Sequence, residues 1–156
     1  MNSGNFRFKV GAFSCIALQD SVGLGGEAAS FFANAPGDAR DHECRRHGVT
    51  GQVTLSLACL LIDTGTQLIL VDTGAGPSDD PALGRLHARL QAEGIAPENI
   101  DTVILTHWHW DHVWGNTRAD GSLAFPHARF VVGRTEWDWA TAEANRQALQ
   151  DVGGER

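Results

Sequence analysis

A group of metal-binding side chains in one short loop constrains this chain more than any other feature. Three histidines and one aspartate follow directly after the apolar run of residues 102–105: His107, His109, Asp111 and His112. Imidazole nitrogen and carboxylate oxygen bind zinc and similar divalent metals at about 2.0 to 2.2 Å. A strand end holds such donors with little loss of freedom on binding. The sequence therefore predicts a metal site where a buried strand meets a loop.

The spacing of the four donors favours two metal ions over one. If the chain leaves the strand still extended, His107 and His109 point to the same side and bind one ion. A tighter turn then lets Asp111 and His112 face a second ion, and Asp111 is also the catalytic candidate. Gathering all four donors around one ion is opposed by the bulky tryptophans between them. The alternative interpretation is a polar loop whose histidines are only hydrogen-bonded.

The loop and its surroundings resemble a known family. The string Thr106-His107-Trp108-His109-Trp110-Asp111-His112 resembles the HxHxDH signature of the metallo-β-lactamase-fold hydrolases. Upstream, residues 61–65 and 68–76 resemble the first hairpin of that family and its Asp-Thr-Gly turn. Downstream, residues 125–132 and 136–138 resemble the segment beyond the metal loop in the branch that contains quorum-quenching lactonases and methyl parathion hydrolase. The resemblance covers nearly the whole chain.

This resemblance implies an α/β fold, namely the N-terminal half of a layered αββα sandwich with a mixed sheet, whose second half is missing. We therefore expect one incomplete domain over residues 1–156, with N-terminal strands and a long loop in 1–52 and the metal-loop half in 53–156. A chain of 156 residues can form one modest core. The strands around residues 53–71 are apolar enough to predict a sheet that is covered on both sides.

In the family, His107 and His109 would bind the first zinc ion, and Asp111 and His112 the second. Two later histidines and a bridging aspartate complete the family's site, whereas only His127 follows the loop here, in a segment that usually carries no ligand. Because a catalytic zinc ion typically has three protein ligands and one open position, we expect this chain alone to bind metal weakly and to turn over little or no substrate. It would be a fragment of a hydrolase, or a second chain would complete its site.

The implied activity is hydrolysis of a lactone or ester by a metal-activated water molecule. Phosphotriesters, thioesters and β-lactams are alternative substrates for the same fold, and a non-catalytic metal-binding remnant is an alternative of another class. Iron-dependent oxidoreductases of this fold typically carry glutamate at the second histidine, so His109 argues against that activity. Asp72, which follows the strand at 67–71, is expected to cap the turn at Thr73 and to support a metal-binding histidine by a hydrogen bond.

Charge and cysteine content limit the classes of binding partner and the cellular location that we expect. The net charge of −7 argues against nonspecific nucleic-acid binding and docking on an anionic membrane, and it is compatible with a small-molecule substrate. Three scattered cysteines without CxxC spacing indicate reduced thiols and a cytoplasmic protein. The start of the chain lacks the layout of a secretion signal. An exposed apolar sheet edge and face would favour self-association.

The rest of the sequence predicts the surrounding elements. Strands are expected at 6–10, 13–18, 53–62, 67–71, 101–105 and 129–132, and a loop without clean period at 28–51. One helix should begin at Asp79-Asp80-Pro81 and end at Gly94, with His87 on its solvent face. A second helix should cover 134–149 and bury Trp137, Ala140, Ala144 and Ala148. His42 and His47 are expected at the surface. Three tryptophans near the loop, Trp108, Trp110 and Trp114, would line an apolar pocket or pack beneath the loop.

Overall fold

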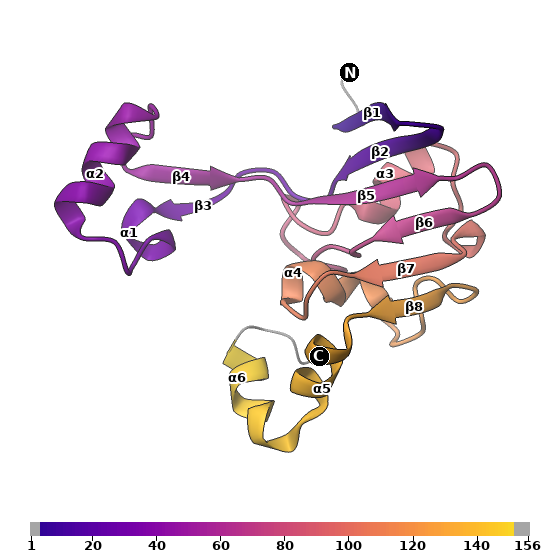
Figure 1. Ribbon diagram of the computed structural model, residues 1–156. Helices are drawn as coiled ribbons and strands as arrows, with labels where there is room; N and C mark the ends of the chain where they lie inside the picture. Colours follow the sequence, from indigo (N-terminus) through magenta and orange to yellow (C-terminus); the bar gives the residue numbers. More distant parts are fainter. Residues whose placement is uncertain (1–3, 152–156) are drawn as a thin grey trace. The chain divides into compact units, whose positions relative to one another are not determined.

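The computed structural model describes residues 4–151 and divides the chain into two compact units (Figure 1). Residues 22–56 form the smaller unit, and the residues before and after it form the larger one. The sequence suggested a division of one domain at residue 52, and that division stays a prediction. That both units belong to one domain stays a prediction.

A six-stranded mixed sheet forms the larger unit. Its strands are β1 (Asn5–Val10), β2 (Phe13–Gln19), β5 (Ala58–Asp63), β6 (Leu68–Val71), β7 (Thr102–Leu105) and β8 (Arg129–Val132). They lie in the order β1-β2-β5-β6-β7-β8, antiparallel as far as β6 and parallel from β6 to β8. The predicted α/β fold with a mixed sheet is confirmed.

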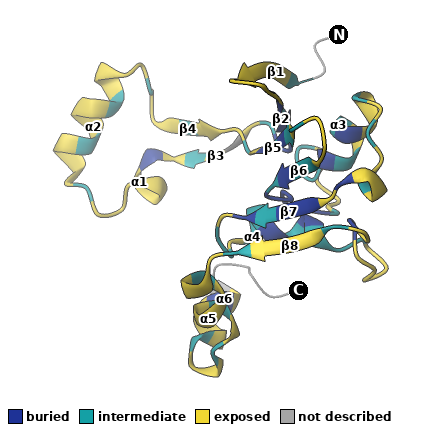
Figure 2. Ribbon diagram, turned by 45° about the vertical axis from the view of Figure 1, so that its right-hand side comes forward, coloured by how far each residue is buried: buried dark blue, intermediate teal, exposed yellow. Residues whose placement is uncertain are grey.

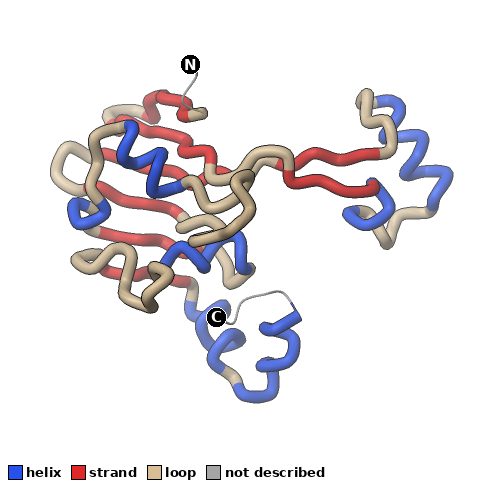
Figure 3. The backbone as a smooth tube through the Cα atoms, turned by 180° about the vertical axis from the view of Figure 1, so that it is seen from behind, coloured by secondary structure: helices blue, strands red, loops and turns tan. Residues whose placement is uncertain are grey.

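The helices of the larger unit lie after β6, after β7 and after β8. They are α3 (Leu86–Ala92), the 3-10 turn η1 (Pro97–Asn99), α4 (Trp110–Val113), η2 (Trp114–Asn116), α5 (Arg134–Thr141), η3 (Glu143–Asn145) and α6 (Arg146–Asp151). The helix α3 crosses from β6 to β7 over one face of the sheet (Figure 3). This strand, helix, strand connection was predicted, and it leaves the histidine loop at the carboxyl end of β7, where open α/β sheets usually hold ligands.

The core of the larger unit lies between α3 and the sheet. A row of side chains in register across the strands, among them Leu61, Leu70 and Val103, is almost fully buried. Leu86 and Leu90 of α3 join the same cluster. Each fully buried leucine contributes about 1.5 to 3 kcal/mol relative to exposure. This core holds the strand that delivers the histidines.

The opposite face of the sheet is more exposed. Phe6, Phe8 and Val10 alternate along β1 and are 68%, 36% and 58% exposed. Figure 2 shows β1 and β8 largely exposed at the two edges of the sheet. The strands were predicted to be covered on both sides, but within residues 4–151 Ile62 and Ile69 of the second face are only half-buried.

The helix predicted from Asp79 to Gly94 begins later than expected. Asp80 caps a local turn instead, because its carboxylate accepts a hydrogen bond from the Ala82 N–H at 2.8 Å. The helix α3 begins at Leu86, whose N–H donates to the buried carboxylate of Asp20 at 2.9 Å. His87 was predicted on the solvent face but is half-buried, and its ring stacks on Phe125 with centroids 5.7 Å apart.

The predicted strand 53–62 is interrupted. Its first part is β4 (Gln52–Leu55), which pairs with β3 (Leu24–Glu27) in a separate two-stranded sheet. Only the second part, β5, joins the large sheet. The break lies at Leu57, whose carbonyl accepts hydrogen bonds from the N–H groups of Asp20 and Ser21 at 2.9 and 3.3 Å. This long-range contact ends the strand although the residues themselves are apolar.

The smaller unit contains helices where the sequence predicted a loop. These are α1 (Ala28–Phe31) and α2 (Gly37–Arg46). No residue of α2 is buried, so its sequence shows no apolar stripe by which the helix could be recognised. His42 and His47 lie on α2 and at its end, exposed beside Glu43, as predicted.

The predicted helix 134–149 is broken into α5, η3 and α6. Ala142 has an extended backbone (ψ 124°), which ends α5. Trp137 is 50% exposed, and Ala144 and Ala148 are also exposed, so the predicted buried side was wrong. The buried residue of this segment is Leu149.

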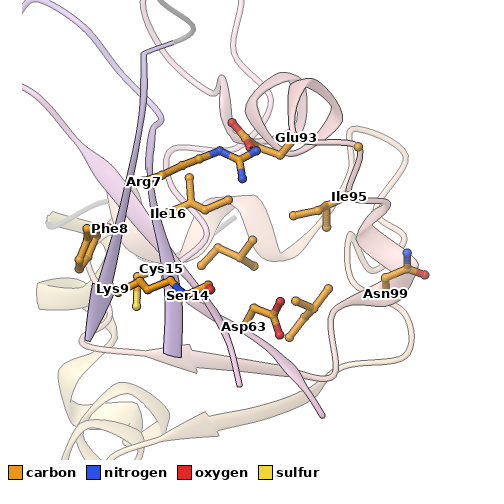
Figure 4. A pocket seen from close by; sticks show the side chains of 13 residues that line it. Arg7, Phe8, Lys9, Ser14, Cys15, Ile16, Asp63, Glu93, Ile95 and Asn99 are labelled. Atoms are coloured by element: carbon orange, nitrogen blue, oxygen red, sulfur yellow. The ribbon is translucent and has the colours of Figure 1, made fainter. Parts of the chain in front are cut away.

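A hollow of about 700 Å³ lies at the end of the sheet away from the histidine loop (Figure 4). Asp63 and Leu68 line it beside the β5–β6 hairpin, and the ion pair of Arg7 with Glu93 lies at its rim. It shares no residue with the histidine cluster. Within residues 4–151, no helix has both the length and the apolar composition that crossing a membrane requires.

Candidate metal centre

Local structure explains how one loop gathers four donors. The strand β7 ends at Leu105, and His109 still has an extended backbone (φ −72°, ψ 149°). The helix α4 then begins at Trp110, and its first turn closes through hydrogen bonds from the His112 and Val113 N–H groups to the His109 carbonyl at 3.0 and 3.2 Å. The extended stretch carries His107 and His109, and the helical turn carries Asp111 and His112.

The structure brings the four predicted side chains together. The ring centroids of His107 and His109 are 4.6 Å apart, and those of His107 and His112 are 3.9 Å apart. Asp111 joins them, with one carboxylate oxygen 3.6 Å from His112 Nε2. Among residues 4–151, however, no three or more histidine, cysteine, aspartate or glutamate side chains are arranged to hold one metal ion. Ligation by these four residues stays a prediction.

Asp72 fixes the orientation of His112. It follows β6, the neighbour of β7, and its Oδ2 accepts a hydrogen bond from His112 Nδ1 at 2.7 Å. The backbone of Asp72 has a φ of +60°, a left-handed conformation that aspartate and asparagine adopt more readily than most residues. Because its Nδ1–H donates a hydrogen bond to this carboxylate, the neutral ring of His112 presents the lone pair of Nε2 outward. This is the form that binds metal.

Thr106 extends this network to His107. Its N–H donates to Asp72 Oδ1 at 2.8 Å, and its hydroxyl lies 2.8 Å from Asp72 Oδ2. An ionised carboxylate only accepts, so the hydroxyl donates to Asp72 and its oxygen accepts the Nδ1 proton of His107 at 3.0 Å. This assignment leaves Nε2 of His107 as a free lone pair, like Nε2 of His112. One carboxylate therefore orients two of the predicted ligands.

The electrostatics of the two rings differ. The hydrogen bond to Asp72 raises the pKa of His112 above its ordinary value and outweighs the opposing effect of burial. Burial lowers the pKa of His107, and the charges of His112 and His109 lower it further. For Asp72, burial acts to raise the pKa, but hydrogen bonds from His112 and Thr106 outweigh it and hold the pKa below the ordinary value. His107 is thus the more easily kept in the neutral form that a metal requires.

Close backbone packing seats α4 on the turn after β6. Thr73 N–H donates to the His112 carbonyl at 2.9 Å, and the Thr73 hydroxyl lies 3.1 Å from both that carbonyl and Asn116 Oδ1. A Cβ atom on Gly115 would lie 1.9 Å from the Thr73 carbonyl oxygen. Only glycine therefore allows this approach, and the sequence reasoning did not assign Gly115 a role.

The tryptophans around the loop differ in their surroundings. Trp108 and Trp114 are partly buried and pack against the core cluster, as expected for packing beneath the loop. Trp110 contacts Trp114 with ring centroids 5.6 Å apart. Trp108 also contacts α5, where Glu136 Oε1 accepts a hydrogen bond from the backbone N–H of Trp108 at 2.7 Å. The sequence placed Glu136 in a segment that resembles the family but gave it no role, because a glutamate 28 residues from its partner carries no spacing signal.

The donor chemistry fits a divalent metal of the zinc type. Two imidazoles present Nε2 lone pairs set by Asp72 and Thr106, and a carboxylate stands beside them. A catalytic zinc ion usually takes three protein ligands, so a dinuclear site would need donors beyond these four residues. His127 lies apart from this network, exposed, with Nδ1 3.1 Å from the Glu98 carbonyl.

Comparison with known proteins identifies the family. Residues 55–150 match the sequence model of the metallo-beta-lactamase superfamily. The chain therefore belongs to this superfamily, and the resemblance inferred from the histidine loop is confirmed.

Solved structures of hydrolases share the fold. The structure of AidC, a dizinc quorum-quenching lactonase in complex with a product, superposes with a TM-score of 0.82 at 26% sequence identity, covering 96% of this chain and 57% of AidC. The hydrolase AbOPH of the beta lactamase superfamily gives a TM-score of 0.83 at 26% identity, covering 99% of this chain and 54% of AbOPH. The chain thus matches just over half of each larger structure.

A curated relative matches a shorter segment. The atrochrysone carboxyl ACP thioesterase of Passalora fulva is 44% identical over 55 residues, which are 35% of this chain and 15% of the relative. The chain therefore spans a small part of this relative and just over half of each of the two structures.

Proposed function

We propose that this protein is a metal-dependent hydrolase of a lactone or ester, and that His107, His109, Asp111 and His112 supply part of its metal ligands. One observation carries the proposal: a single buried carboxylate, Asp72, orients Nδ1 of His112 directly and Nδ1 of His107 through Thr106. Such support fixes the tautomer of metal-binding histidines and is a usual companion of metal sites.

Each side chain has a distinct part in this proposal. His107 and His109 offer nitrogen donors from the extended stretch, while Asp111 and His112 offer oxygen and nitrogen donors from the first turn of α4. When bound, divalent metals of this kind supply Lewis acidity and make water a nucleophile near neutral pH. Asp111 is half-buried beside His112, and we retain it as the catalytic candidate, a carboxylate that would accept a proton at the site.

The lactone or ester substrate is supported by similarity. AidC, described as a quorum-quenching lactonase, is 26% identical and superposes over 96% of this chain. Fold similarity alone does not define a substrate. A thioester is the second candidate, because the 44% identical segment belongs to a protein named as an ACP thioesterase.

Zinc is the metal we propose, with two ions in a complete site. The support is the imidazole and carboxylate donor set, together with the dizinc description of AidC. We also propose a small-molecule partner, no nucleic-acid partner and a cytoplasmic location. The net charge of −7 and the free thiols of Cys15, Cys44 and Cys59 support these proposals.

The test is zinc-dependent hydrolysis by the 156-residue chain. N-hexanoyl homoserine lactone, p-nitrophenyl acetate and an acyl thioester would be assayed with added zinc and again after EDTA treatment. Because the described donors are only part of a ligand set, we expect low but zinc-dependent turnover. His109→Ala should reduce it by more than about 100-fold, since losing even the hydrogen-bond partner of a ligand costs 10-fold to 100-fold.

The matched control is His127→Ala, which removes an exposed imidazole bonded to the Glu98 carbonyl and should leave turnover unchanged. Turnover that survives EDTA would contradict the proposal. So would turnover that is equal in the His109 and His127 variants.

A further inference from the structure

Two neighbouring residues of α5 hold the middle of the histidine loop. Glu136 Oε1 accepts the Trp108 N–H at 2.7 Å, and the ring of Trp137 meets the ring of Trp108 edge-on, with centroids 6.0 Å apart and planes at 76°. Backbone and side chain of Trp108 are thus both bound to the same helical turn. Trp108 is the residue between His107 and His109.

The topology of the sheet explains why a residue so far along the chain reaches this loop. The strands β7 and β8 are parallel neighbours, with Leu105 opposite Val132. The loop follows the end of β7, and α5 follows the end of β8 after Gly133. Both segments therefore begin at the carboxyl ends of neighbouring strands, which places the first turn of α5 beside the loop.

The chemistry of the contact suits a positioning role. Once β7 has ended at Leu105, the Trp108 N–H lies outside the strand ladder, and the charged acceptor Glu136 makes a stronger hydrogen bond to it than a neutral acceptor would. Rotation of the peptide at Trp108 would turn the side chains of His107 and His109 relative to each other. A fixed Trp108 backbone N–H therefore restrains the backbone from which the two imidazoles project.

We propose that Glu136 is a positioning residue that holds His107 and His109 in the relative orientation in which they bind one metal ion, with Trp137 as its packing partner. The inference rests on the proposed function for its link to metal. The clamp on Trp108 itself can be measured without metal, so the two ideas can fail separately.

The main experiment compares Glu136→Ala with Glu136→Gln by zinc titration calorimetry. Removing the acceptor should weaken zinc binding by about 10-fold to 100-fold, as loss of support around metal ligands typically does. Glutamine keeps an oxygen acceptor, so Glu136→Gln should recover most of the affinity. The control is Asp138→Ala, which removes an exposed carboxylate from the same helix and should leave zinc affinity unchanged.

A metal-free readout tests the clamp directly. Amide hydrogen exchange of Trp108 should be faster by about 10-fold or more in Glu136→Ala, the effect of losing one hydrogen bond to a charged group, and unchanged in Asp138→Ala. The melting temperature of each variant shows that it is folded.

Each result decides one idea. Unchanged Trp108 exchange in folded Glu136→Ala would overturn the clamp. Faster exchange with unchanged zinc affinity would overturn the positioning role. If the unmodified chain bound no zinc while Trp108 exchange responded as expected, the proposed function and the positioning role would both be wrong, and the clamp alone would stand.

Discussion

At the scale of single residues, the site depends on Asp72. This residue adopts a left-handed backbone, accepts hydrogen bonds from His112 and Thr106, and acts on His107 through Thr106. The position of Asp72 after a strand predicted both a turn-forming and a supporting role. The sequence alone did not indicate which histidine it contacts, because that depends on the pairing of β6 with β7.

Asp72→Asn tests the supporting role without changing backbone preference, since asparagine also tolerates a positive φ. An amide nitrogen facing His112 Nδ1 cannot accept its proton, so the ring should move its proton to Nε2. We expect zinc affinity to fall by about 10-fold to 100-fold. The tautomer is measured by 15N chemical shifts of the imidazole, and an Nε2 that stays unprotonated in the variant would contradict the account.

Asp20 gives a prediction of pH dependence. It is fully buried, and its two oxygens accept hydrogen bonds from the N–H groups of Ala75 and Leu86 at 2.9 Å each. Burial raises its pKa above the ordinary value of 3.8, and the hydrogen bonds offset this only in part. The folded protein then holds this proton more tightly than the unfolded chain does, so the contribution of Asp20 to stability falls as pH rises from about 3.8 through the raised pKa.

Asp20→Asn removes this titration and leaves one N–H without an acceptor oxygen, at a cost of about 1 to 3 kcal/mol. The unfolding free energy of both proteins would be measured by urea titration between pH 4 and 7. The native protein should be more stable than the variant by a margin that shrinks as pH rises. A margin of stability that grows with pH would contradict the raised pKa of Asp20.

At the scale of elements, the sequence predicted the segments whose structure follows from neighbouring residues. It failed where contacts between residues far apart in the sequence determine where an element begins or ends. The apolar strand β7 and the histidine loop after it were predicted, because the residues of each are contiguous in the sequence. The start of α3 was not, because it depends on the Leu86 N–H reaching Asp20, and neither was the break at Leu57. The helix α2 was missed because it buries no residue.

Gly115→Ala tests how α4 is seated. An added methyl group would lie 1.9 Å from the Thr73 carbonyl oxygen, so the turn after β6 and the segment after α4 must move apart. Overpacking of this kind costs about 1 to 3 kcal/mol, and thermal unfolding should show it. Gly133→Ala is the matched control, because no heavy atom lies within 4 Å of its added methyl group. Equal melting temperatures for the two variants would count against close packing at Gly115.

At the scale of the whole molecule, one face of the sheet carries exposed apolar side chains. Phe6 and Phe8 stack with centroids 6.1 Å apart, and Phe13, which is paired with Val10 across the strands, adds a further exposed ring. Contiguous apolar surface of this kind favours association, and the edge strand β1 adds unpaired backbone groups. Self-association of the isolated chain, which the sequence also suggested, stays a prediction.

Sedimentation velocity at several concentrations tests this prediction. The unmodified chain should sediment as a mixture that shifts to larger species with concentration, and the double variant Phe6→Lys, Phe8→Lys should shift toward monomer. Lys9→Gln, which alters the other face of β1, should behave like the unmodified chain. A chain that stays monomeric at every concentration would disprove the prediction.

The central claim is that the loop of His107, His109, Asp111 and His112 binds metal. The most direct measurement is a zinc titration followed by the 15N imidazole signals of all the histidines in the chain. We predict that the Nε2 signals of His107, His109 and His112 shift with zinc, while those of His42, His47, His87 and His127 do not. Uniform shifts across all histidines, or no shift of the loop histidines at millimolar zinc, would contradict it.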